Sequence, residues 1–236
     1  MVKKKAAAAA VDTLLVELLT EELPPKALKS LSETFAQALA ADLNQHNFLT
    51  EGSATRAFAT PRRLAAIVTR VLAQAPDKLV EFSGPSVKVA LDPQGKPTPA
   101  LLGFAKKQGV DVSKLERQNT PKGEVFVYRT LATGGYLMSG LDLVVEDALR
   151  KLPIPKIMRW GSGDAQFVRP VHGLLMMHGA KLIAGEVLGI SSTNRTLGHR
   201  FLSTKPIALK HAEDYEHALR TDGKVEPEFA KRRQSA

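Results

Sequence analysis

The pattern of hydrophobic and polar residues predicts strands alternating with helices. A nearly continuous apolar run over residues 14–19 is typical of a strand covered on both faces. Apolar residues recur at helical spacing over 25–44 and predict an amphipathic helix. Residues 58–72 are apolar and β-branched again, and we expect one strand there with a kink at Pro61. Residues 12–75 therefore form an N-terminal α+β unit.

A middle α+β subdomain is predicted over residues 76–152, where turn signals are dense. A helix should begin at Pro99 and end at Gly109. A strand follows over 124–131, and a second amphipathic helix over 139–152 would take Ser139 as its N-cap.

The sequence predicts a basic, strand-rich third subdomain over residues 153–220. The runs 167–178 and 181–188 are separated by Gly-Ala, which indicates a hairpin with a two-residue turn. We expect a polar loop over 191–199 and a helix over 208–220.

The two ends of the chain differ from the rest. Residues 1–11 begin with three lysines and five alanines and are interpreted as a disordered or cloning-derived extension. Residues 221–236 are expected to start a linker or helix into further domains. The predicted fold class is α+β, with mixed and antiparallel sheets, flanking helices and two or three small subdomains.

Charge is distributed unevenly along the 236 residues, whose net charge is +9. Residues 12–51 carry seven acids and two bases, whereas residues 150–210 carry ten bases and two acids. A basic half favours a polyanionic partner such as nucleic acid, and we expect its cations to form one surface. A plain solvated face, or a face that binds an acidic protein, would give the same composition.

Several kinds of chemistry find no support in the sequence. The chain has no cysteine, which excludes disulfides and thiolate metal sites and fits a reducing compartment. It contains no glycine-rich phosphate-binding motif, and its six histidines do not show metal-ligand spacing. No apolar run is long enough to span a membrane. The chain is therefore predicted to hold no metal or cofactor of its own.

Two charged pairs flank the first strands. Glu21 and Glu22 could stabilise the start of the following helix through its dipole, or serve as a functional carboxylate. Arg62 and Arg63 could pair with these glutamates, contact RNA or solubilise an edge strand.

The basic half contains three further groups of candidate binding residues. Lys156 and Arg159 lie beside Trp160, the only tryptophan, which could stack on a base or anchor the core under Arg159. The other two groups could contact a phosphate backbone or a partner subunit, and they are Arg169 with His172, and Arg195 with His199 and Arg200.

Five motifs appear in one order along the chain: Thr20-Glu21-Glu22-Leu23-Pro24, Phe58-Ala59-Thr60-Pro61-Arg62-Arg63-Leu64-Ala65, Lys156-Ile157-Met158-Arg159-Trp160-Gly161, Phe167-Val168-Arg169-Pro170-Val171-His172 and Gly198-His199-Arg200-Phe201. Together they resemble the N-terminal region of the bacterial glycyl-tRNA synthetase β subunit.

The resemblance implies a cytoplasmic, heterotetrameric ligase in which ATP and Mg²⁺ act in the α subunit. The β chain would contribute to binding of glycine tRNA and to assembly with that α subunit, and would not be catalytic alone. The alternative is an interaction scaffold with no direct RNA contact.

Overall fold

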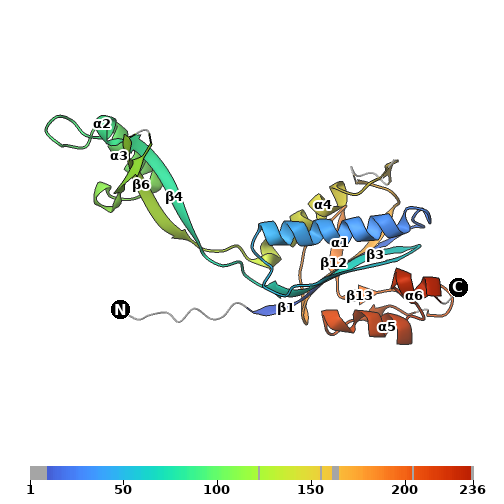
Figure 1. The fold of residues 1–236 in the computed structure, drawn as a ribbon. Coiled ribbons are helices and arrows are strands. Elements are labelled where there is room, and N and C mark those ends of the chain that lie inside the picture. Colours follow the sequence, from blue (N-terminus) through green and yellow to red (C-terminus); the bar gives the residue numbers. More distant parts are fainter. Residues whose placement is uncertain (1–9, 122, 155, 161–164, 204, 235–236) are drawn as a thin grey trace. The chain divides into compact units, whose positions relative to one another are not determined.

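The chain folds into two units that each have their own core. The computed structural model describes residues 10–121, 123–154, 156–160, 165–203 and 205–234. Unit 1 consists of Met1–Ala75 and Gly135–Ala236, and unit 2 of Pro76–Gly134. Helices and several small sheets occur together (Figure 1), which confirms the predicted α+β class. The predicted extension over 1–11 lies almost entirely outside the described residues.

Unit 1 is organised around one seven-stranded sheet of order β11-β12-β9-β1-β3-β2, with β10 paired to β9. Only β12 and β9 run parallel, and the other pairs are antiparallel. The strands are β1 (Val11–Thr20), β2 (Thr55–Thr60), β3 (Arg63–Leu72), β9 (Val171–His178), β10 (Lys181–Leu182), β11 (Glu186–Val187) and β12 (Ile190–Thr193). Two short strand pairs lie outside this sheet: β7 (Met158–Arg159) with β8 (Gln166–Phe167), and β13 (Arg195–Thr196) with β14 (Ile207–Ala208).

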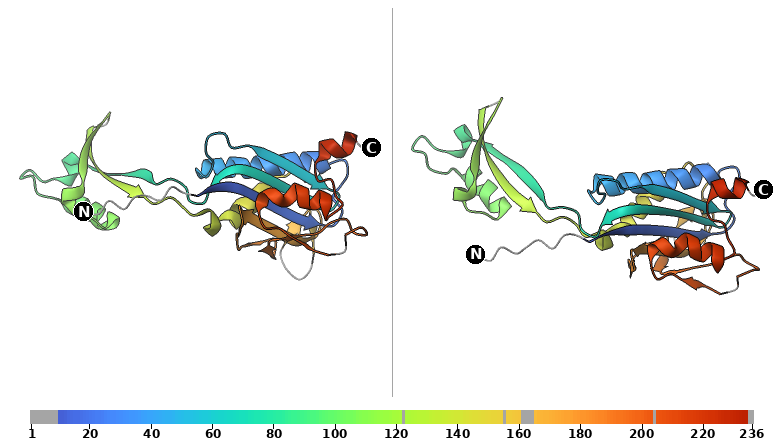
Figure 2. Two further views of the ribbon diagram at one scale, coloured as in Figure 1. Left: turned by 90° about the horizontal axis from the view of Figure 1, so that it is seen from below. Right: turned by 60° about the horizontal axis from the view of Figure 1, so that its bottom comes forward.

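Helices cover both faces of the central sheet, as the views in Figure 2 show. The helices of unit 1 are α1 (Leu28–Gln45), η2 (Leu137–Ser139), α4 (Leu141–Arg150), η3 (Ala212–Asp214), α5 (Tyr215–Thr221) and α6 (Phe229–Gln234). Side chains alternate along β1: Leu14 and Val16 belong to the core under α1 and α4, whereas Leu15 belongs to the core under α5. This explains the continuous apolar run, because both faces of the strand are buried.

Unit 2 has a three-stranded antiparallel sheet of order β4-β6-β5. Its elements are β4 (Lys78–Ser86), α2 (Val87–Ala90), α3 (Pro99–Gln108), η1 (Val112–Lys114), β5 (Glu116–Thr120) and β6 (Gly123–Ala132). The predicted helix from Pro99 is confirmed, and Gly109 ends it with a left-handed φ of 67°. The predicted strand over 124–131 is confirmed within β6.

Three local predictions were wrong. Residues 58–72 form a hairpin of β2 and β3, because Pro61 and Arg62 make a turn rather than a kink. Helix α4 begins at Leu141 with Gly140 as its N-cap, and Ser139 instead ends a short 3₁₀ turn. The predicted loop over 191–199 contains β12, which pairs with β9.

The observed units also differ from the predicted division into three subdomains. Helix α4, assigned by sequence to the middle subdomain, packs against α1 in unit 1. Strand β9, assigned to the third subdomain, pairs with β1 from Leu14 to Thr20. Pairing between segments more than 150 residues apart leaves no local pattern in the sequence. The prediction therefore assigned the segments of one core to separate subdomains. Residues 221–236 were expected to start a linker or a helix, and they include the helix α6.

Candidate nucleic-acid interface at one end of the central sheet

The segment Thr20–Pro25, called the corner here, leaves β1 at one end of the sheet and binds the β2–β3 turn. The Thr20 N–H donates to the Arg62 carbonyl at 3.0 Å, and the Leu23 N–H donates to the Pro61 carbonyl at 2.6 Å. The Arg62 guanidinium also lies 2.5 Å from the Glu21 carboxylate. Backbone and side-chain contacts together therefore fix the corner against this turn.

The other side of the corner contacts the start of β9. The Glu21 N–H donates to the Pro170 carbonyl at 2.9 Å, and Arg169 Nε donates to the Glu22 carbonyl at 2.9 Å. Arg169 Nη1 lies 3.5 Å from Met158 Sδ, which brings the β7–β8 pair to the same place. Arg169 therefore connects three of the five motifs, and its guanidinium is committed to structural contacts.

Arg63 lies in the interior and forms a buried cluster with Glu17 and Tyr215. Arg63 Nε and the Tyr215 hydroxyl donate to Glu17 Oε1 at 2.5 and 2.7 Å, and the side chains of Arg63 and Glu17 are 3% and 0% exposed. Burial is the largest influence and acts to lower the pKa of Arg63, but the charges of Glu17 and Tyr215 and the hydrogen bond to Glu17 together outweigh it and raise that pKa. Burial, followed by the same negative charge, raises the pKa of Tyr215 well above its usual value.

The buried cluster also anchors the fifth motif. Arg63 Nη2 donates to the Leu197 carbonyl and, at 3.3 Å, to the Thr196 hydroxyl. The following residue, Gly198, packs so closely that an added Cβ would lie 2.6 Å from the Gly223 backbone. This loop is therefore held by the buried Arg63 guanidinium and by the close packing of Gly198 against Gly223.

Residues from four of the five motifs line one cleft of about 910 Å³, and the motif that contains Lys156, Arg159 and Trp160 does not contribute to it. Its lining combines acidic, basic and apolar side chains: Leu19, Glu21, Glu22, Thr60, Pro61, Arg62, Arg63, His172, Leu197, Gly198, His199, Arg200, Phe201, Ser203, Lys224, Val225, Glu226 and Arg232. Of the ten candidate residues from the sequence, this cleft brings together Arg62, Arg63, His172, His199 and Arg200. Glu21 and Phe201 are 180 positions apart in the sequence, and both line the cleft at this end of the central sheet.

The cations in the cleft differ in how far they are already neutralised. Arg62 pairs with Glu21 and Arg63 with Glu17. Among the described residues, Arg200 and Lys224 have no carboxylate partner, and Arg200 lies over the Phe201 ring at 5.5 Å. These two side chains are the cations best placed to bind an anion in this cleft.

The other predicted site residues lie outside the lining of the cleft. Lys156 and Arg159 are exposed, and Trp160 is half-buried against the core under α1 and α4. Trp160 therefore fits the core-anchor interpretation. Arg195 is exposed on β13.

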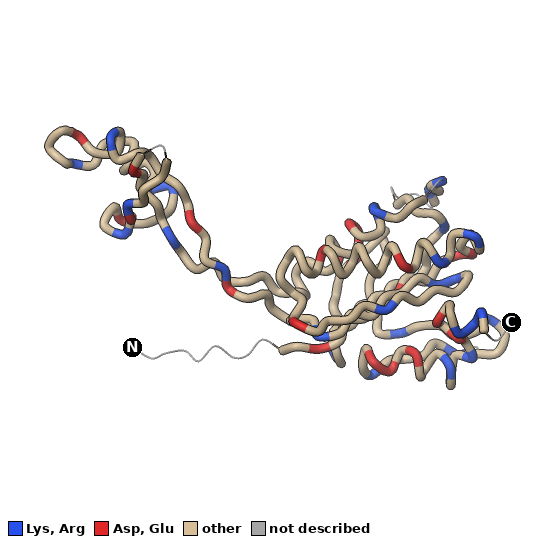
Figure 3. Tube along the Cα trace, viewed as in Figure 1, with Lys and Arg blue, Asp and Glu red and all other residues tan. Residues whose placement is uncertain are grey.

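The expected single basic surface was wrong for part of the basic half. Arg150 forms ion pairs with Glu146 and Asp147, and Lys151 lies 2.5 Å from Asp42. Figure 3 shows Lys and Arg spread over the chain and interspersed with acids. Local pairing on helices, which a count of charges along the sequence ignores, neutralises these cations.

The corner contradicts one of the two interpretations of Glu21 and Glu22, and the functional-carboxylate interpretation stays a prediction. A turn separates them from α1, which begins only at Leu28 and has no acid in its first turn, so the helix-start interpretation was wrong. Glu21 is instead the surface partner of Arg62, as one of the alternatives proposed.

Sequence reasoning left two residues of the cleft out of the predicted site. Phe201 is 76% exposed, an unusual environment for a phenylalanine, and it adjoins Arg200 inside a motif already identified. Lys224 has a positive φ of 54° and belongs to none of the five sequence motifs. An aromatic residue next to two bases was the available signal for Phe201.

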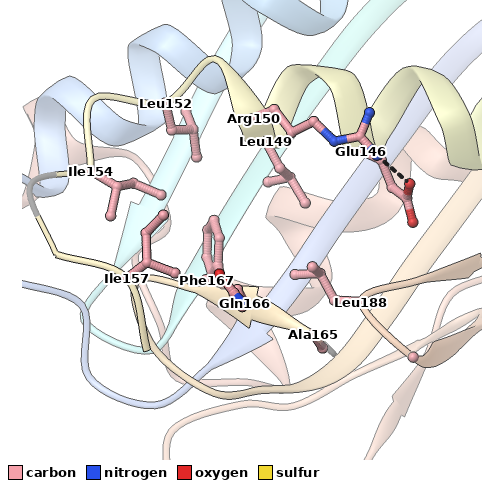
Figure 4. A pocket seen from close by; sticks show the side chains of 11 residues that line it. Glu146, Leu149, Arg150, Leu152, Ile154, Ile157, Ala165, Gln166, Phe167 and Leu188 are labelled. Atoms are coloured by element: carbon pink, nitrogen blue, oxygen red, sulfur yellow. Dashed lines mark hydrogen bonds and ion pairs between the residues drawn. The ribbon is translucent and has the colours of Figure 1, made fainter. Parts of the chain in front are cut away.

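A second pocket of about 720 Å³ lies between α4, residues 154, 157 and 165–167, and the β11–β12 turn (Figure 4). Its walls are mainly apolar and include Leu149, Ile157 and Phe167, with the Arg150–Glu146 ion pair at the side. This lining offers packing rather than acid–base chemistry. The described residues contain no group of three or more potential metal ligands, and none of their helices has the length and apolarity of a membrane span.

Comparison with known proteins defines the class to which this arrangement belongs. A family model described as glycyl-tRNA synthetase beta subunit matches residues 14–236. The match places the chain in the class of aminoacyl-tRNA synthetase subunits. More narrowly, the chain belongs to the glycyl-tRNA synthetase beta subunit family.

Individual relatives agree with the family model. The glycine–tRNA ligase beta subunit of Aromatoleum aromaticum is 49% identical over 94% of this chain. Those of Neisseria meningitidis serogroup A and Haemophilus influenzae are 44% and 45% identical over 94% and 93% of it. The chain spans 30–32% of the length of these three relatives.

Proposed function

We propose that this chain is the N-terminal part of the β subunit of a cytoplasmic glycine–tRNA ligase. In this proposal it binds glycine tRNA and assembles with an α subunit into a heterotetramer. ATP and Mg²⁺ act in the α subunit, which joins glycine to the tRNA. The chain contributes binding and orientation rather than reacting groups.

The observation that carries the proposal is the meeting of four of the five motifs around one cleft that contains cations without a carboxylate partner. Arg200 and Lys224 line this cleft without a carboxylate partner among the described residues. Exposed Phe201 adds an aromatic surface beside them. Cations next to an exposed ring match the two contacts that RNA offers, a phosphate and a base.

Titration of glycine tRNA with this chain, with and without the α subunit, tests the proposal. We expect the chain alone to bind tRNA, with an affinity that falls linearly on a log scale as salt rises. We expect it to form a complex with the α subunit and to charge no glycine by itself. Capture of the α subunit without tRNA binding at low salt would favour the scaffold alternative.

A further inference from the structure

Resting on this proposed function, we propose that the cleft binds an unpaired nucleotide of the RNA, with the base on Phe201 and the phosphate between Arg200 and Lys224. The site would thus distinguish single-stranded RNA from the regular duplex. The argument depends on the exposed ring, on how the loop is held, and on the cations at its sides.

The Phe201 ring is presented to solvent in a defined position. It is 76% exposed, and the next residue, Leu202, is 67% exposed. The His199 ring lies 6.1 Å from it, and the Arg200 guanidinium lies 5.5 Å from its centroid. The Phe201 ring, flanked by the His199 imidazole and the Arg200 guanidinium, provides a surface on which a base can stack.

The loop that carries this ring is fixed rather than loose. The His199 N–H donates to the Gly223 carbonyl at 2.6 Å, and the Ser203 N–H donates to the His199 carbonyl at 2.9 Å. The Phe201 N–H lies 3.3 Å from His199 Nδ1. Below the loop, Arg63 holds the Leu197 carbonyl from the core. A ring that is ordered before binding loses little entropy when a base stacks on it.

The surrounding charges fit a phosphate. Lys224 Nζ donates to the Thr221 carbonyl at 2.7 Å, and its backbone is held in the left-handed region. Arg200 and Lys224 both line the cleft, and His172 and His199 add further N–H donors. The lining carboxylates Glu21 and Glu226 are neutralised by Arg62 and Arg220. An anion therefore meets mainly unneutralised positive charge, with Glu22 as the exposed exception.

Duplex RNA does not offer the same contacts. The bases of a helix are stacked on one another, and its grooves present hydroxyls, base edges and phosphates rather than ring faces. An exposed phenylalanine gains nothing from such a surface. Away from the ends of a helix only an unpaired base can cover Phe201, so the chemistry favours single strands, loops or ends.

The experiment compares two labelled RNA hairpins by fluorescence anisotropy, using the whole 236-residue chain. One hairpin carries a tail of about four unpaired nucleotides, and the other has the same stem with a blunt end. We expect the wild-type chain to bind the tailed hairpin about tenfold more tightly, and Phe201→Ala to remove this difference. Leu143→Ala, which truncates a side chain that is 64% exposed on α4, is the matched control and should change neither affinity.

The two cations are tested by their salt dependence. Lys224→Gln should weaken binding of the tailed hairpin and reduce the slope of log affinity against log salt by about one. Lys181→Gln removes the same charge beside the β9–β10 turn, at the far end of β1 from the cleft, and should leave that slope unchanged. Arg200→Gln should act like Lys224→Gln.

The possible results separate the inference from the proposed function. Equal binding of both hairpins, unaltered by Phe201→Ala, overturns the unpaired-nucleotide site but leaves tRNA binding by this chain intact. No binding of either hairpin or of tRNA overturns both. If Phe201→Ala instead weakens only the complex with the α subunit, the ring is a protein contact and the inference is wrong.

Discussion

The Glu17 carboxylate accepts a hydrogen bond from the Arg63 guanidinium at 2.5 Å, and both side chains are buried on the face of the sheet that α5 covers. Strands β1 and β3 supply the two residues, and Tyr215 from α5 adds a hydroxyl to the same carboxylate oxygen. Because Arg63 also holds the Leu197 carbonyl, the charge pair connects the middle of the sheet to the wall of the cleft. Adjacent Arg62 forms an equally short pair with Glu21, but at the surface.

The two neighbouring arginines should differ sharply in their effect on stability. Arg63→Met leaves the Glu17 carboxylate buried without its cation, and we expect a loss of about 3–5 kcal/mol in the free energy of unfolding. Arg62→Met removes a pair whose side chains are 34% and 50% exposed, and we expect a loss of about 0–1 kcal/mol. Urea denaturation of both variants measures the difference.

A double variant provides the control for this prediction. Combining Arg63→Met with Glu17→Leu removes both charges, so part of the lost stability should return, although the Tyr215 hydroxyl loses its acceptor. If the double variant is no more stable than Arg63→Met alone, loss of packing rather than an unpaired charge explains the result.

Tyr215 should make the protein sensitive to high pH. Its pKa is raised in the folded state, chiefly by burial and then by Glu17, so the folded chain holds this proton more tightly than the unfolded chain. The resulting stabilisation is fully present below about pH 10, the usual pKa of tyrosine, and is lost as the pH rises above it. Tyr215→Phe should therefore show a smaller fall in unfolding free energy between about pH 9 and pH 11.

The same variant should cost about 1–3 kcal/mol at neutral pH, because Glu17 loses a hydrogen bond of 2.7 Å in the interior. Tyr136→Phe changes a side chain that is 55% exposed and serves as the control for both measurements. A decline at high pH as steep in Tyr215→Phe as in the wild type would refute the prediction.

Gly198 should tolerate no side chain. A Cβ there would lie 2.6 Å from both the Gly223 backbone and Ser203 Cβ, so Gly198→Ala must displace the loop that carries Phe201. We expect destabilisation of about 1–3 kcal/mol and weaker tRNA binding. Gly103→Ala is the matched control, because nothing lies within 4 Å of its Cβ position and alanine favours helix α3 by about 1 kcal/mol. Similar effects of the two substitutions on tRNA binding would contradict the close-packing argument.

Local patterns in the sequence were sufficient for some of the elements but not for their assembly. The apolar run in β1 and the Pro99–Gly109 helix limits follow from neighbouring residues, and both were predicted. The pairing of β9 with β1, and of β12 with β9, depends on contacts between distant segments. The predicted subdomain division missed this pairing because periodicity describes one segment at a time.

The candidate site shows the same limit. Arg62 and Arg63 are adjacent and chemically identical, and no local rule decides which one is buried. Strand alternation turns Arg63 toward Glu17 and Tyr215 on the α5 face, whereas Arg62 lies in the turn. The motifs indicated where the interface residues would be found, but the meeting of four of them at one end of the central sheet required the fold.

Glu226 should contribute stability that disappears in acid. Its carboxylate accepts two hydrogen bonds from Arg220, at 2.8 and 3.0 Å, and these lower its pKa in the folded state. Its stabilising effect is therefore present above about pH 4.5, its usual pKa, and is lost as the pH falls through the lowered folded value. Because both side chains are about one-third exposed, we expect Glu226→Gln to cost about 1 kcal/mol or less at neutral pH.

Urea denaturation at about pH 7 and about pH 4 measures this contribution, and Glu226→Gln should lose less stability between the two values than the wild type. Glu33→Gln breaks an exposed pair on α1 whose atoms are 3.7 Å apart, and its effect should be close to zero at either pH. The ion pair joins α5 to the segment that carries Lys224. If Glu226→Gln matches the wild type at both pH values, the Arg220 contact does not hold this side of the cleft.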